Sequence, residues 1–224
     1  MKINSAIAAR REDRLSKLAQ DIQSRGGKAL ILPMDVTDRA QIEAQFAFVS
    51  TNIGDPTILI NNAGLPSNYG FLEATAADTA SVFSVNQMAA WNVAQHFARK
   101  LVAAELKGSI VNIASITGLR ATGGAASYAV SKAAVAHMTR VQALELARHG
   151  IRANAIAPGY FDTDLNQDFL SSEVGQKLVK RIPMRRTGRL EDLDGLLLLL
   201  ASCRSAFMTG AVIPVDGGHL VSSL

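Results

Sequence analysis

The sequence is poor in cysteine and histidine, the residues that form the disulfides of small extracellular proteins or bind metal ions. Its 224 residues include a single cysteine, Cys203, so no disulfide can form within the chain. The four histidines are scattered, and none stands at a zinc-ligand spacing from another histidine or from Cys203. We therefore expect no metal site.

Long hydrophobic runs are also missing. The apolar run near the end of the chain, 196–201, is far too short to span a bilayer. The N-terminus carries Lys2 but lacks the apolar stretch of a secretory signal peptide. From these absences we expect no membrane partner and a cytoplasmic location.

No charge of one sign dominates. The 23 basic and 19 acidic residues leave a net charge of +4. Basic residues cluster at Arg10-Arg11 and again over 177–189, without the interleaved aromatic residues that nucleic-acid binding favours, so we expect no nucleic-acid partner. The second cluster (Lys177, Lys180, Arg181, Arg185, Arg186) suits either an acidic substrate or plain solvated surface.

What the chain does contain is an alternation of strand-like and helix-like segments. The length and a hydrophobic content of 48% fit one soluble domain covering 1–224. Short apolar runs predict strands at 3–9, 29–34, 57–60, 109–114, 151–156 and 211–215. Helices are expected between them, at 79–107, 127–148 and 191–202, and two more are expected to follow Arg14 and Asp38. Asp38 is a candidate N-cap for the helix that follows it. This order predicts an α/β fold: a parallel sheet with helices on both faces.

Three polar residues stand out in the central stretch 108–132. Ser115 ends a predicted strand, and Tyr128 and Lys132 lie in the first turns of a predicted helix. Residues four apart share one helix face, so we expect the Lys132 ammonium near the Tyr128 phenol. A nearby cation stabilises the phenolate, which predicts a lowered pKa for Tyr128 and a role in proton transfer. Ser115 would then hold the oxygen of a carbonyl or alcohol.

Together with further motifs, this Ser-x12-Tyr-x3-Lys pattern resembles the short-chain dehydrogenase/reductase family. The other motifs are Asn61-Asn62-Ala63-Gly64, the stretch around Asn86, Pro158-Gly159 followed by Thr163, and 209–218. The resemblance implies a Rossmann-like doubly wound sheet and hydride transfer between a nicotinamide cofactor and a carbonyl or secondary alcohol. It also implies a catalytic set of Asn86, Ser115, Tyr128 and Lys132, with Asn86 ordering a relay water. The pattern is similar to the 3-oxoacyl-carrier-protein reductase and sugar dehydrogenase branches, and it names no single substrate.

The resemblance also implies a cofactor site and an assembly. Ala9 stands where NAD-preferring relatives carry Asp, and the following Arg10 suits a 2′-phosphate, so we predict NADP(H) rather than NAD(H). Family members commonly form homodimers or homotetramers, and the apolar run from Leu196 to Leu200 is either a deep core helix or a subunit interface. The implied cofactor contacts are Arg10, Arg11, Asp35, Val36, Asn61, Ala63, Gly64, Tyr128, Lys132, Pro158, Gly159, Phe161 and Thr163.

One family feature is absent from the sequence. No TGxxxGxG turn, which would cradle the cofactor diphosphate, precedes the first helix, and the first βα unit of the fold is missing. The lost strand would lie in mid-sheet, so strands 3–9 and 29–34 must either pair directly with 57–60 or leave backbone groups unpaired. Either the natural protein has upstream residues, or the chain is an inactive relative that serves as a binding or scaffold protein. The filled catalytic positions favour the first explanation.

Overall fold

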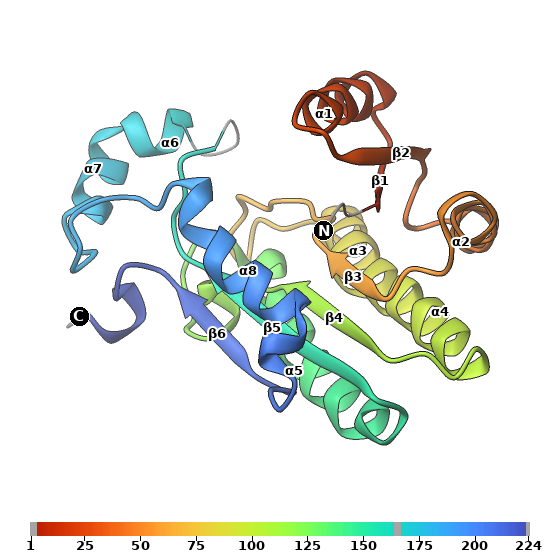
Figure 1. The fold of residues 1–224 in the computed structure, drawn as a ribbon. Helices are drawn as coiled ribbons and strands as arrows, with labels where there is room; N and C mark the ends of the chain where they lie inside the picture. The colour runs from red at the N-terminus through yellow and green to blue at the C-terminus, as the bar shows by residue number, and fades with distance from the viewer. Residues whose placement is uncertain (1–3, 164–166, 223–224) are drawn as a thin grey trace.

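The computed structural model describes residues 4–163 and 167–222. Strands and helices alternate along the chain as the sequence predicts (Figure 1). The strands are β1 (Asn4–Ala9), β2 (Lys28–Pro33), β3 (Ile58–Asn61), β4 (Gly108–Ile113), β5 (Ile151–Pro158) and β6 (Val212–Val215). The α-helices are α1 (Glu12–Ser24), α2 (Arg39–Ile53), α3 (Ala76–Phe83), α4 (Ala90–Ala103), α5 (Ala126–Leu146), α6 (Gln167–Ser171), α7 (Glu173–Val179) and α8 (Asp194–Ala201).

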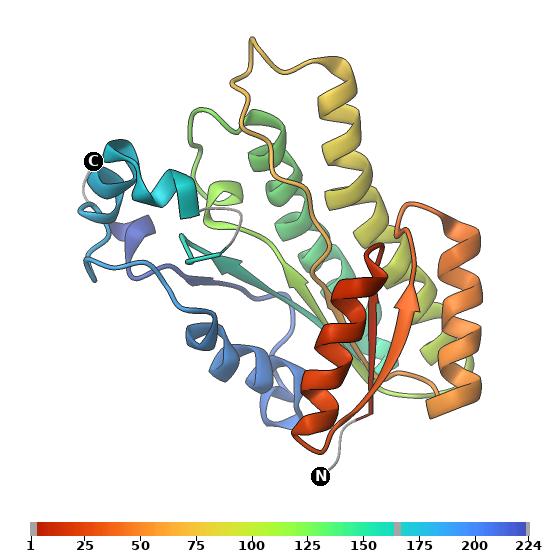
Figure 2. The same ribbon diagram turned by 90° about the horizontal axis from the view of Figure 1, so that it is seen from above.

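The strands form two parallel sheets, one of order β1-β2 and one of order β3-β4-β5-β6. Helices α4 and α5 cover one face of the larger sheet and α8 covers the other (Figures 1 and 2). Leu200 of α8 packs on Val111 and Ile156, whereas Ile110 packs against α4 and α5 on the opposite face. Both faces of the inner strands are therefore buried, which explains why their sequences read as continuous apolar runs.

Strands β1 and β3 do not pair with each other. Of the two outcomes expected for this region, the structure shows the second, in which the strand edges stay unpaired. Ile58 and Ile60 of β3 are each 43% exposed, in contrast to the fully buried Ile110 of the neighbouring β4. A hydrophobic cluster that includes Met34, Ile42 and Val93 joins the smaller sheet to α4, so side-chain packing replaces the missing strand pairing.

The helix boundaries follow local chemistry. The side chain of Asp38 accepts hydrogen bonds from the backbone N–H groups of Ala40 and Gln41, so the predicted N-cap is confirmed. The single helix predicted over 79–107 is instead α3 and α4 joined by a π-helical turn, Ser84–Ala89, and it ends at Ala103. Such turns often mark functional positions, and no sequence periodicity announces them.

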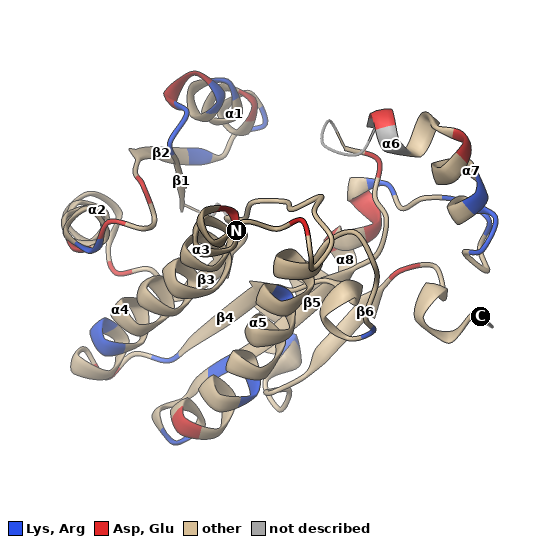
Figure 3. Ribbon diagram, turned by 180° about the vertical axis from the view of Figure 1, so that it is seen from behind, with Lys and Arg blue, Asp and Glu red and all other residues tan. Residues whose placement is uncertain are grey.

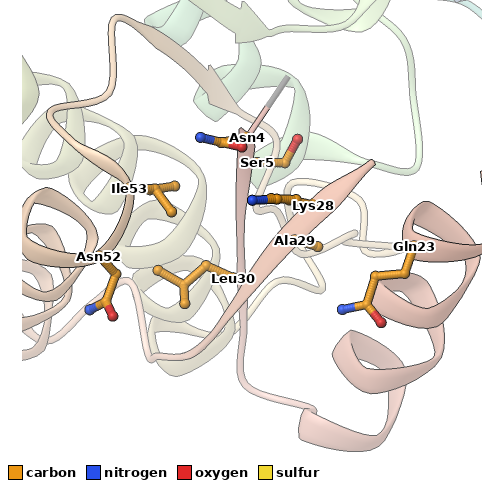
Figure 4. Close-up of a pocket in the computed structure, with 8 residues that line it drawn as sticks. All are labelled: Asn4, Ser5, Gln23, Lys28, Ala29, Leu30, Asn52 and Ile53. Atoms are coloured by element: carbon orange, nitrogen blue, oxygen red, sulfur yellow. The ribbon is translucent and has the colours of Figure 1, made fainter. Parts of the chain in front are cut away.

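One cavity lies away from the carboxyl ends of the strands. It measures about 530 Å³ and is lined by the amino ends of β1 and β2 and the last turns of α1 and α2 (Figure 4). The lining residues are Asn4, Ser5, Gln23, Lys28, Ala29, Leu30, Asn52 and Ile53, none of which the sequence predicts to be functional. Among the helices of the described residues, none has the length and apolarity to cross a membrane.

Candidate active site

The predicted site residues follow the carboxyl ends of neighbouring parallel strands. Ser115 comes two residues after β4, Asn61 ends β3 and Pro158 ends β5. Residues at this edge of a parallel sheet meet at one crevice, as in other open α/β folds. The larger sheet thus places Ser115 at the same edge as Asn61 and Pro158.

Ser115 and Tyr128 lie close together, although they belong to different elements, the turn after β4 and the first turn of α5. The Ser115 hydroxyl is near enough to the phenol to act on the pKa of Tyr128, which it lowers. Ser115 Oγ also accepts hydrogen bonds from the backbone N–H (3.2 Å) and the hydroxyl (3.0 Å) of Thr117. Because those two bonds use the lone pairs of Ser115 Oγ, its own proton is directed toward Tyr128 or a substrate oxygen.

Lys132 is buried, with 5% of its surface exposed. Its Nζ donates to the backbone carbonyl of Ile113 at 2.7 Å, and it lies 5.6 Å from the centre of the Tyr128 ring. Burial lowers the pKa of Lys132 to about 8, because removing an ammonium from water disfavours its charge. At neutral pH the group remains mainly protonated.

The pKa of Tyr128 moves opposite to the sequence prediction. Burial raises it, the hydrogen bond from Ser115 works against that rise, and nearby Tyr160 adds to it. The predicted lowering by Lys132 is wrong for this arrangement: burial dominates the pKa of Tyr128, and the Lys132 ammonium donates to the Ile113 carbonyl. Tyr128 is consequently a protonated acid at neutral pH.

Gly118 explains how the turn after β4 comes so close to α5. A Cβ at this position would lie 2.5 Å from the carbonyl carbon of Lys132 and 2.6 Å from the nitrogen of Ala133. Both atoms belong to helix backbone, which cannot move aside easily. Only glycine therefore lets the Ser115 turn pack directly on the helix that carries Tyr128 and Lys132.

Asn86 is buried in the π-helical turn and its side chain is held at three points. Its Oδ1 accepts from the backbone N–H of Leu65 at 2.7 Å, and its Nδ2 donates to the Leu65 carbonyl and to Ser131 Oγ, both at 3.0 Å. Oδ1 retains one lone pair. A Cβ on Gly64 would lie 3.4 Å from that oxygen and 3.7 Å from Lys132 Nζ, so both atoms converge on the face of this glycine.

The remaining predicted cofactor contacts lie at strand ends and on loops of the same edge. Asn61 donates to Asn112 Oδ1 at 2.9 Å, while Ala63 is exposed. Phe161 is buried and forms a bridge with Gly188, and Thr163 is partly exposed. Pro158 closes β5, and the N–H of Gly159 donates to the carbonyl of Val215.

Four predicted contacts belong to the smaller sheet. Arg10 and Arg11 are exposed where β1 meets α1, and Asp35 and Val36 follow β2. Hydrogen bonds from the backbone and hydroxyl of Thr37, and the charge of Arg10, hold the pKa of Asp35 below its usual value. The structure thus places two cations and one carboxylate at the carboxyl edge of the β1-β2 pair.

The charged side chains on and after α7 are partly paired with each other. Basic residues gather along α7 and the segment after it (Figure 3), where Lys177 pairs with Glu173 and Arg186 with Asp192. Within 4–163 and 167–222, no three His, Cys, Asp or Glu side chains are grouped closely enough to hold a metal ion.

The sequence analysis missed two buried polar residues that support the site. Asn112 on β4 is fully buried; its Nδ2 donates to Thr139 Oγ1 at 2.9 Å and to Gln142 Oε1 at 2.8 Å, both on α5. Ser131, also fully buried, contacts Asn86. A polar residue inside an apolar strand, as in Ser109–Ala114, signals a required partner and could have identified Asn112.

Comparison with known proteins agrees with this geometry over nearly the whole chain. The family model described as enoyl-(acyl carrier protein) reductase matches residues 3–219. The chain is 36% identical to the 5-keto-D-gluconate 5-reductase of Escherichia coli K12, over 98% of this chain and 85% of the relative. It is 34% identical to the 3-oxoacyl-[acyl-carrier-protein] reductase of Thermotoga maritima, over 94% of this chain and 85% of the relative.

A solved structure shares the fold. The gluconate 5-dehydrogenase of Burkholderia cenocepacia, in complex with NADP and tartrate, superposes with a TM-score of 0.92 at 34% identity. The match covers 97% of this chain and 86% of that one. The predicted resemblance and its two branches are therefore confirmed.

The close packing at Gly118 predicts a large effect of one methyl group. Gly118→Ala should lower the free energy of unfolding by about 2–3 kcal/mol, because the new Cβ would overlap the α5 backbone. Gly123→Ala is the matched control: a Cβ there meets no atom within 4 Å, and its φ is not positive. Urea denaturation followed by circular dichroism measures both, and equal stabilities would contradict the packing argument.

The buried Lys132 predicts a pH-dependent stability. In the unfolded chain its pKa returns to about 10.5, so between pH 8 and 10.5 the unfolded state binds more protons and stability rises with pH. The wild type should gain about 3 kcal/mol relative to Lys132→Met over that window, at about 1.4 kcal/mol per pKa unit. Loss of the Ile113 bond in the variant adds only a constant offset. Parallel curves of unfolding free energy against pH would contradict the prediction.

Proposed function

Because this chain belongs to the short-chain dehydrogenase/reductase family of oxidoreductases, we propose that it transfers a hydride between NADP(H) and a carbonyl or secondary alcohol. The observation that carries the proposal is the placement of Tyr128 near Ser115 and one helical turn from the buried Lys132, whose Nζ lies 5.6 Å from the Tyr128 ring centre. Burial keeps Tyr128 protonated at neutral pH, which is the state needed to donate a proton to a carbonyl oxygen.

The residues around Lys132 fit the nicotinamide end of a dinucleotide. The buried ammonium makes one hydrogen bond to Ile113 and has two further protons to donate, which suits the hydroxyls of a ribose. Gly64 borders the space on which Lys132 Nζ and Asn86 Oδ1 converge, at 3.7 and 3.4 Å from where a Cβ would stand. The cofactor supplies the hydride; the protein supplies placement and the proton.

In the proposed reaction each residue has a separate role. Ser115 Oγ donates to the substrate oxygen and fixes its position beside Tyr128. Tyr128 Oη gives its proton to that oxygen in reduction, or takes one in oxidation. Lys132 binds the ribose, and Asn86 orders a relay water through the free lone pair of Oδ1. Pro158, Gly159, Phe161 and Thr163 border the nicotinamide, and Asn61, Ala63 and Gly64 border its ribose.

The adenosine end rests on the smaller sheet. We assign the 2′-phosphate of NADP to Arg10 and Arg11, which are exposed at the end of β1, and the adenine to Asp35 and Val36. The complex of the Burkholderia gluconate 5-dehydrogenase with NADP supports this choice. The names of the relatives favour a small carbonyl or alcohol substrate.

The second candidate is a protein that keeps the fold for partner binding. Such a protein would need no dinucleotide, whose diphosphate a TGxxxGxG turn, not found in these 224 residues, would hold by hydrogen bonds of about 1.5–3 kcal/mol each. For either candidate we propose a homodimer or homotetramer that buries the apolar α8, where Leu198 is 63% exposed. Titration of NADPH separates the two: saturation at micromolar concentration supports an enzyme, and no binding at millimolar concentration supports a scaffold.

Replacing Tyr128 tests the proton donor. Tyr128→Phe should lower kcat for carbonyl reduction by about 10²–10⁴-fold, the usual contribution of general acid–base catalysis. NADPH binding, followed by fluorescence, should change little because the ring is retained. Unchanged turnover in the variant would rule out the proposed role.

Cofactor preference tests the assignment of Arg10. The wild type should have a higher kcat/KM with NADPH than with NADH. Arg10→Asp should lower the ratio of these two kcat/KM values at least tenfold and make NADH the preferred cofactor, because a carboxylate repels a 2′-phosphate and binds the ribose diol. Arg14→Asp, at an exposed position in the first turn of α1, is the charge-matched control and should keep the preference. Equal rates of the wild type with NADH and NADPH would count against NADP.

A further inference from the structure

Ser131 lies between Tyr128 and Lys132 in sequence, and nothing in the proposed reaction uses it. It is fully buried, and its hydroxyl makes two hydrogen bonds. Oγ donates to the Tyr128 carbonyl at 2.7 Å, one turn earlier in α5, and accepts from Asn86 Nδ2 at 3.0 Å. The second bond joins residues 45 positions apart, on two different helical segments.

The direction of these bonds is fixed by the available protons. A serine hydroxyl has one proton, and the nearby helix carbonyl takes it, as is common for serine inside helices. Ser131 Oγ can then only accept, which suits the amide NH2 of Asn86 and excludes its oxygen. The Leu65 backbone imposes the same orientation from the other side, since its N–H faces Oδ1 and its carbonyl faces Nδ2.

Asn86 therefore ties two parts of the site together. Leu65 holds the amide against the turn that follows β3, and Ser131 holds it against the first turns of α5. Without Ser131, Asn86 would keep both bonds to Leu65 but lose its link to α5. One amide proton would be buried without an acceptor, which is costly inside a protein.

We propose that Ser131 is a positioning residue for proton transfer: acting through Asn86, it holds the Tyr128–Lys132 turn in register with the Gly64 turn. This inference rests on the proposed function for its kinetic consequence, but not for its structural one. Ser131 touches neither substrate nor cofactor in the proposed arrangement; it sets the distance between the group that gives the proton and the surface that borders the nicotinamide ribose.

The structural consequence is measured by NMR on ¹⁵N-labelled protein without substrate. The two side-chain amide protons of Asn86 have different acceptors, so they should give separate signals, both slow to exchange with water. In Ser131→Ala, the proton that faced Ser131 should shift upfield and exchange at least tenfold faster, while the proton bonded to Leu65 stays protected. Identical spectra in the two proteins would overturn the proposal.

The kinetic consequence is measured by carbonyl reduction with NADPH. Ser131→Ala should lower kcat at least tenfold and leave KM for the carbonyl within twofold, and Ser131→Thr, which keeps the hydroxyl, should restore most of kcat. The control is Ser127→Ala, one turn earlier in α5. Ser127 is buried too, but among the described residues its Oγ has no hydrogen-bond partner, so its loss should leave kcat unchanged.

A double-mutant cycle identifies the route of the effect. If Ser131 acts through Asn86, then Ser131→Ala should cost little further kcat in an Asn86→Ala background. Additive losses would overturn the proposal, because Ser131 would then act independently of Asn86. If the wild type has no reductase activity, the proposed function is refuted but the role of Ser131 is not. The NMR measurement then decides whether Ser131 orients the Asn86 amide.

Discussion

The hydrogen bond from the Lys132 ammonium to the Ile113 carbonyl fixes the geometry on which the site depends. It joins α5 to the carboxyl end of β4, and Ser115 follows Ile113 by two residues while Tyr128 precedes Lys132 by one helical turn. An ammonium removed from water is expensive unless it finds an acceptor. The carbonyl at the strand end provides one, so a single bond both makes the buried charge tolerable and sets the approach of Ser115 to Tyr128.

Buried polar side chains extend this connection in both directions along α5. Asn112 reaches Thr139 and Gln142 two turns or more beyond Lys132, and Asn86 reaches Ser131 immediately before it. Such bonds are directional, whereas the packing of alanine and valine against a sheet tolerates sliding. The polar contacts therefore specify the register of the helix on the sheet, and the apolar contacts supply the burial.

The sequence predicted the elements and the meeting of Ser115 with Tyr128, because periodicity and strand ends carry that information. It did not predict the acceptor of Lys132, since a backbone carbonyl such as that of Ile113 has no sequence signature. The π-helical turn around Asn86 was missed for a similar reason: its i→i+5 bonds join backbone groups over only six residues and have no side-chain signature. The unpaired β1 and β3 edges were foreseen as one of two outcomes, and sequence alone could not choose between them.

The sign of the Tyr128 pKa shift was the least predictable property, because it depends mainly on how deeply the folded chain buries the phenol. Sequence spacing gives the cation, but not how its charge is directed. With the ammonium bound to Ile113 at 2.7 Å and 5.6 Å from the phenol ring centre, burial prevails and Tyr128 stays protonated. A protonated tyrosine is ready to protonate a carbonyl but must first lose its proton to accept one from an alcohol.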